Sequence, residues 1–145
     1  MLVRVAATLA AAMPIVADGQ SAPLPLTSMA SVDGNCSSLI VESRRTSCGG
    51  IAFNMIYGER NASIMFKSGD GVVSFFGTRD DDGGLTVTKV TIGREGQPPQ
   101  AVSMPATGHC TVAVLSKPNT HLECSADTSD GKHFAVAFSS TGTPR

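Results

Sequence analysis

The stretch IAFNMIYGERNASIMFKSGDGVVSFF, residues 51–76, decides the fold class of this chain. It holds three short apolar runs, at 51–57, 63–67 and 72–76, and the first places Ile51, Phe53, Met55 and Tyr57 on one face. Such alternation is typical of β-strands, because successive side chains of a strand point to opposite faces. Gly69-Asp70-Gly71 supplies residue types that tolerate the positive φ angles of a tight hairpin. The stretch therefore predicts three consecutive antiparallel strands.

The same pattern continues on both sides of this stretch. Further strands are expected at residues 38–42, 85–92, 110–115, 121–126 and 132–139. The apolar positions change phase between Val87 and Val90, which predicts a β-bulge. Segment 93–108 is expected to be a long connection, because its prolines remove donors from a strand ladder. About eight short strands without a helix indicate an all-β domain, either an antiparallel β-sandwich or a small β-barrel.

The first nineteen residues have the features of a cleaved signal peptide. Arg4 supplies a positive charge, residues 5–12 are apolar, and Ala17 and Gly19 are small residues suited to cleavage. The apolar run is much shorter than the roughly 20 residues of a membrane-spanning helix. We therefore expect a secreted or periplasmic protein with a signal peptide at 1–19, a flexible lead-in at 20–34, a single β-domain at 35–142 and no transmembrane helix after signal cleavage.

Four cysteines, Cys36, Cys48, Cys110 and Cys124, all follow the predicted signal peptide. In an oxidising compartment such cysteines form disulfides. Four cysteines allow three pairings, and we favour Cys36–Cys48 with Cys110–Cys124 because each pair flanks one predicted hairpin. No C-x-x-C motif occurs, so the spacing does not indicate a zinc or redox site.

Composition argues against a nucleic-acid partner. The formal net charge is −1, and the chain has no Trp and one Tyr. It therefore lacks both the basic stripe and the stacking surface of nucleic-acid-binding proteins. All six Phe fall in apolar runs and are expected in the core. No glycine-rich phosphate-binding loop is present, so no cofactor is predicted.

Two groups of residues could in principle hold a metal. His109, His121 and His133 lie near the last strands, and imidazole suits copper and zinc. Asp80, Asp81 and Asp82 share one turn, but the ligand spacing of an EF-hand calcium loop is missing. We expect solvated side chains in both groups and predict no metal site.

The chain has no G-x-S-x-G or H-E-x-x-H motif, so no catalytic residue is predicted. Arg44 and Arg45 are the candidate binding residues, since the disulfide Cys36–Cys48 would constrain their loop. The leading hypothesis is a non-enzymatic binding protein whose partner is a secreted or envelope protein or a small apolar ligand. The alternatives are a secreted hydrolase with a triad of distant residues and an envelope-associated structural protein.

Overall fold

In a computed structural model of the chain, residues 24–69, 71–94 and 100–145 are described. The predicted signal peptide, residues 1–19, lies outside these ranges. The described residues form nine strands: β1 (Leu26–Val41), β2 (Arg44–Arg45), β3 (Cys48–Tyr57), β4 (Asn61–Ser68), β5 (Gly71–Arg79), β6 (Leu85–Arg94), β7 (Gln100–Cys110), β8 (His121–Thr128) and β9 (His133–Ser140). None of these residues belongs to a helix that is long and apolar enough to cross a membrane.

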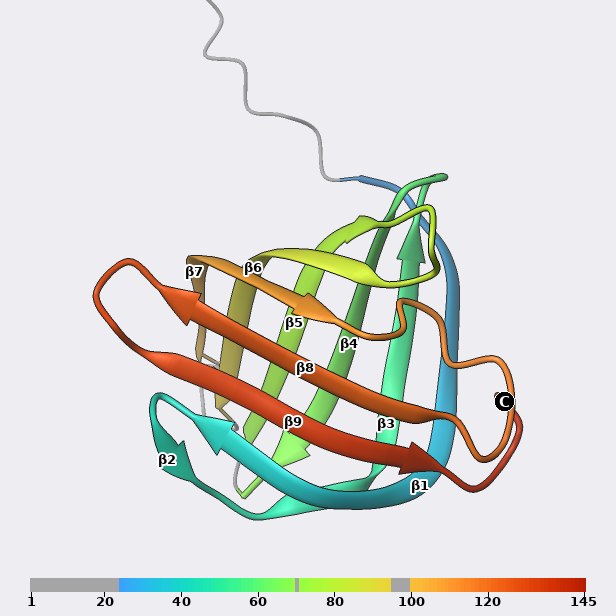
Figure 1. The fold of residues 1–145 in the computed structure, drawn as a ribbon, viewed down its shortest axis with the longest axis horizontal. Helices are drawn as coiled ribbons and strands as arrows, with labels where there is room; N and C mark the ends of the chain where they lie inside the picture. The colour runs from blue at the N-terminus through green and yellow to red at the C-terminus, as the bar shows by residue number, and fades with distance from the viewer. Residues whose placement is uncertain (1–23, 70, 95–99) are drawn as a thin grey trace, which may run out of the picture.

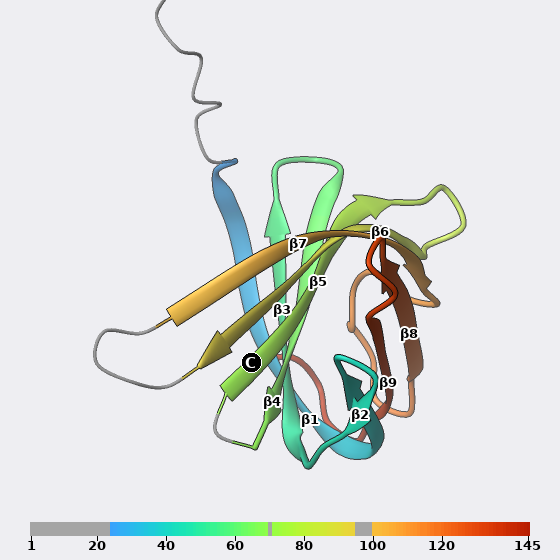
Figure 2. The same ribbon diagram turned by 90° about the vertical axis from the view of Figure 1, so that its left-hand side faces the viewer.

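The strands close into an antiparallel barrel of eight strands, and β2 adds a short ninth strand to β1 (Figure 1). Closure depends on β1, which pairs with β3 over residues 26–33 and with β9 over residues 34–40. The change of partner falls at Gly34, where a Cβ would lie 2.3 Å from the carbonyl oxygen of Ser139. A side chain there would push β9 away, so this glycine permits the close approach. Figure 2 shows β1 curving from β3 toward β9. The fold is therefore a barrel and not a sandwich.

Large side chains fill the interior of the barrel. Phe66, Phe75, Phe134 and Phe138 are fully buried, and the ring centroids of Phe66 and Phe138 are 5.6 Å apart. The dense packing typical of protein interiors therefore extends through the middle of this barrel.

Two phenylalanines do not lie in this core, although the sequence pattern predicted that all six would. In β3 the interior positions belong to Ala52 and Asn54, which are buried, so alternation places Phe53 on the outer face. Phe76 is also only half-buried and meets Tyr57 edge-on, with centroids 5.7 Å apart. Alternation predicts a strand correctly but does not say which of its two faces turns inward.

Both disulfides have the predicted pairing. Cys36–Cys48 joins β1 to β3, and Cys110–Cys124 joins β7 to β8 at directly opposite positions. The predicted bulge is also present, because the register between β5 and β6 shifts where Val87 and Lys89 face Gly77 and Phe76.

Three segments differ from expectation. Residues 26–34, placed in a flexible lead-in, form the first half of β1, and Val32 is fully buried. Residues 93–94 and 100–108 of the expected connection are strand, while residues 95–99 lie outside the described ranges. Pro105 lies beside the bulge and before Ala106, where pairing with β8 begins. Proline is tolerated at such positions. Residues 111–115, expected to be strand, belong to the loop between β7 and β8.

This loop closes one end of the barrel. Ala113 and Leu115 are buried, and the side chain of Asn54 hydrogen-bonds to both: Nδ2 donates to the carbonyl oxygen of Ala113 and Oδ1 accepts from the N–H of Leu115, each at 3.0 Å. The opposite end, where β1 leads into β2 and β6 ends, has no such plug among the described residues. A cavity lies there instead.

Candidate functional site

The cavity at the open end has a volume of about 540 Å³ and is lined by residues from five strands and their turns. Arg44, Arg45 and Arg94 contribute guanidinium groups, while Val41 and Ile92 contribute apolar surface. The two arginines singled out from the sequence therefore border a concavity. They lie in strand β2, opposite Val41 and Ile40, and not at the turn itself.

A strained hairpin turn positions Arg44 and Arg45. Glu42 and Ser43 connect β1 to β2 with φ angles of 50° and 64°, values that favour glycine or asparagine. Contacts to β9 hold this conformation: the N–H of Ser43 donates to the carbonyl oxygen of His133 at 2.8 Å, and the N–H of His133 donates to Ser43 Oγ at 3.0 Å. The hairpin is therefore docked on the barrel and does not project freely from it.

Arg94 comes from the end of β6, opposite Gly71 at the start of β5. Arg94 and Arg44 lie far apart in the sequence, and no motif indicates that they line the same cavity. Sequence reasoning missed Arg94 for this reason. Only the closed order of strands brings β6 to the same end of the barrel as the β1–β2 hairpin.

The three arginines give this end of the barrel its electrostatic character. Among the described residues, the only arginine in an ion pair is Arg145, which contacts Asp33. Glu42, the one described acidic residue in the cavity lining, pairs with Lys132, with Oε2 and Nζ 3.4 Å apart. Guanidinium groups donate paired hydrogen bonds that match carboxylate and phosphate oxygens. The cavity can therefore receive an anion.

A second cavity of about 310 Å³ shares Glu42, Ile92 and Arg94 with the first. It adds the apolar side chains of Val102 and Met104. Val102 is 58% exposed and contributes apolar surface to this cavity. With Lys132, which also lines the second cavity, the open end combines four cationic groups with apolar surface.

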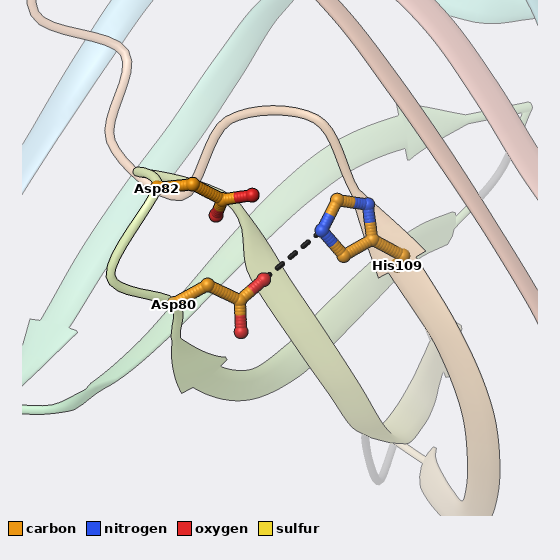
Figure 3. Close-up of side chains that lie close together, drawn as sticks. All are labelled: Asp80, Asp82 and His109. Carbon is orange, nitrogen blue, oxygen red and sulfur yellow. Dashed lines mark hydrogen bonds and ion pairs between the residues drawn. The ribbon is translucent and has the colours of Figure 1, made fainter.

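The histidines occupy three separate places. His109 meets Asp80 and Asp82 near the closed end, with Nε2 of His109 3.0 Å from Oδ2 of Asp80 (Figure 3). His133 pairs with Asp127, and the Nδ1 to Oδ1 distance is 2.7 Å. Asp80 and Asp82 of the acidic turn therefore lie beside an imidazole, although the sequence predicted separately solvated side chains.

His121 joins a serine and a glutamate on the outside of the barrel. Its Nδ1 is 3.0 Å from Ser139 Oγ, and its Nε2 is 3.2 Å from Glu123 Oε1. The imidazole lies between a serine and an acid, as in a catalytic triad. In serine proteases, however, Nε2 contacts the serine and Nδ1 contacts the acid, which is the reverse of the arrangement at His121. The side chains of His121 and Glu123 are 58% and 62% exposed, so water has free access to them.

These features define an eight-stranded antiparallel barrel whose own chain fills one end and whose other end carries a basic, partly apolar cavity. Comparisons of the chain with models of protein families, with curated proteins and with solved structures find no match.

Proposed function

We propose that this protein is an exported, non-enzymatic binding protein that holds a small anionic ligand with an apolar portion at the open end of its barrel. One observation carries the proposal: Arg44, Arg45 and Arg94, from two distant parts of the sequence, line the same cavity. In small-molecule sites, a few convergent polar or charged groups fix the orientation of the ligand.

The packed interior supports a ligand held at the mouth of the barrel. Small barrels with a hollow centre can enclose an apolar molecule, but here Phe66, Phe75 and Phe138 fill the centre. The docking of Ser43 on His133 favours a small ligand over insertion of the hairpin into a protein partner. We therefore narrow the expected small apolar ligand to one that also carries a negative charge: an amphiphilic carboxylate or phosphate ester.

Octanoate and octylamine provide a direct test, because they share an apolar tail and differ in the sign of the head group. In isothermal titration calorimetry, we expect octanoate to bind and octylamine not to bind. Arg94→Gln should weaken octanoate binding at least tenfold, since hydrogen bonds to charged groups contribute about 1.5–3 kcal/mol. Arg60→Gln is the matched control, because Arg60 lies in the β3–β4 turn at the opposite end. Equal binding of both probes, or equal loss in both variants, would contradict the proposal.

The two disulfides support export, because such bonds persist in oxidising compartments. We infer that residues 1–19 direct the chain to the periplasm or the medium and are then removed. Mass spectrometry of the protein recovered after expression should show a mature N-terminus near residue 20 and no free thiols. Fractionation separates this proposal from the envelope-associated alternative, which predicts stable retention with the cell envelope.

A second candidate function is hydrolysis, because His121 contacts both Ser139 and Glu123, but the geometry makes it the weaker candidate. A fluorophosphonate probe labels an activated serine, so an active triad predicts labelling that is lost in Ser139→Ala and His121→Gln. We expect no labelling, because the exposed site neither excludes water nor uses the usual ring nitrogens.

A further inference from the structure

The closed end of the barrel gathers one imidazole and two carboxylates from two separate segments. Asp80 and Asp82 lie in the β5–β6 turn, and His109 lies in β7 (Figure 3). One ligand atom from each residue lies within 4.8 Å of the other two. We propose that these three residues form a binding site for a divalent transition metal ion of the zinc type.

Strand register explains why these residues meet. Thr86 in β6 faces His109 in β7, which brings the imidazole beside the start of the hairpin. The turn folds back on itself, because the N–H of Asp80 donates to the carbonyl oxygen of Gly84 at 2.8 Å. The two acidic residues and the histidine therefore share one corner of the barrel.

In each carboxylate, one oxygen already has a partner in the protein. Asp80 Oδ1 accepts a hydrogen bond from Thr86 Oγ1 at 2.5 Å, and Asp82 Oδ1 accepts one from the N–H of Gly84 at 3.2 Å. These bonds orient the carboxylates, and the second oxygen of Asp80 faces His109 Nε2 at 3.0 Å, where an ion would replace the shared proton. Such supporting hydrogen bonds are usual around metal ligands in proteins.

The backbone of Gly84 packs closely against two of the ligand atoms. A Cβ at Gly84 would lie 2.6 Å from His109 Nε2 and 3.0 Å from Asp80 Oδ2. The positive-φ glycine of this turn is Gly83, so the backbone angles of Gly84 do not call for glycine. The absence of a side chain instead lets Gly84 approach His109, Asp80 and the carbonyl oxygen of Cys110, which would lie 3.0 Å from the same Cβ.

The spacing of His109 and Asp80 and the types of ligand suit zinc. Ligand atoms around a tetrahedral zinc lie about 3.4 Å apart, because each bond is about 2.0–2.2 Å long. His109 Nε2 and Asp80 Oδ2 are 3.0 Å apart, so they need to separate by only a few tenths of an ångström. Imidazole nitrogen favours zinc, nickel or copper over calcium, which prefers six to eight oxygen ligands. Three protein ligands leave a fourth position for water.

The other two histidines provide internal controls. His133 contacts Asp127, and His121 contacts Glu123, each with a single carboxylate. Among the described residues, only the group at His109 offers three possible ligands to one ion.

Nuclear magnetic resonance of the untagged, disulfide-bonded chain tests the site without a mutation. On addition of zinc chloride, we expect the imidazole resonances of His109 to shift with saturation at one ion per chain, while those of His121 and His133 stay in place. Calcium chloride should cause no such shift. Equal shifts of all three histidines, no shift, or an equal response to calcium would overturn the assignment.

Calorimetry with zinc chloride then measures the contribution of each ligand. We expect Asp82→Asn and His109→Gln to weaken zinc binding at least tenfold and His133→Gln to leave it unchanged. The far-ultraviolet circular dichroism of each variant confirms that it is folded. Unchanged affinity in folded Asp82→Asn and His109→Gln, or an equal loss in His133→Gln, would overturn the proposal.

Discussion

Asn54 and Leu115 lie 61 residues apart, and the N–H of Leu115 donates to Oδ1 of Asn54 at 3.0 Å inside the barrel. The Nδ2 group of Asn54 donates to the carbonyl oxygens of Ser63 and Ala113 as well. One buried amide thus satisfies three backbone groups and holds the β7–β8 loop in the end of the barrel. This contact makes the two ends of the molecule different.

We expect Asn54→Ala to lower the free energy of unfolding by about 3 kcal/mol, because it leaves buried backbone groups without partners. Urea denaturation followed by circular dichroism measures the change. Asn61→Ala is the control: Asn61 is half-buried at the start of β4, and no described contact depends on its side chain. A loss below about 0.5 kcal/mol in Asn54→Ala would show that the loop does not depend on this residue.

Two buried serines should respond to the same substitution with opposite signs. Ser63 Oγ is buried and has no hydrogen-bond partner among the described residues, so Ser63→Ala should stabilise the fold by about 1 kcal/mol. Ser140 Oγ donates to the carbonyl oxygen of Lys117 at 2.7 Å and accepts from the N–H of Thr120 at 2.9 Å. Ser140→Ala should therefore cost about 2 kcal/mol. Thermal denaturation of both variants compares them, and a shift of the same sign in both would contradict this account.

The two disulfides should differ in how much stability they contribute. Their loops have similar sequence separations, 12 and 14, so the chain-entropy contribution is about 3 kcal/mol for each. Cys110 and Cys124 are also buried in the core, whereas Cys36 and Cys48 are partly exposed. Replacing Cys110 and Cys124 with alanine therefore removes packing contacts in the core as well as the cross-link.

We expect the Cys110→Ala/Cys124→Ala variant to be less stable than the Cys36→Ala/Cys48→Ala variant by at least about 1 kcal/mol. Guanidinium denaturation of the two double variants provides the measurement. Equal stabilities would show that burial of the sulfur atoms adds nothing to the effect of the cross-links.

Asp130 provides a prediction for acidic pH. A hydrogen bond from the hydroxyl of Thr128, followed by the charge of Lys132, lowers the pKa of the Asp130 carboxyl below its ordinary value of 3.8. A lowered pKa in the folded state contributes stability above the unfolded value, and this contribution disappears as the pH falls through the folded pKa. Thr128→Val should raise the pKa of Asp130 toward 3.8.

The pKa of Asp130 can be followed by nuclear magnetic resonance of its side-chain carboxyl carbon between pH 2 and pH 6. Thr107→Val is the control, because Thr107 is an exposed residue of β7 in register with Asp127 and not with Asp130. The explanation is wrong if the carboxyl titrates at the same pH in Thr128→Val and in the parent protein.

Local patterns in the sequence predicted the fold class correctly but misplaced some strand boundaries. Alternation predicted the strands between residues 51 and 76, and the phase change after Val87 predicted the bulge. Pro105 misled, because β7 has β8 as a second partner only from Ala106 onward. A prolyl residue on an unpaired edge does not break a strand, and no local pattern shows which residues lie on such an edge.

The sequence by itself determined an all-β chain with two local disulfides, because strand periodicity and hairpin-flanking cysteines are properties of neighbouring residues. Only the tertiary structure decided that β1 pairs with both β3 and β9 to close a barrel. Closure in turn brings Arg94 and Arg44 to one cavity, and the register of β6 with β7 brings His109 to Asp80, pairs that no local pattern links. These relationships depend on register and strand order, which arise from long-range pairing of the backbone and from the packing of one shared core.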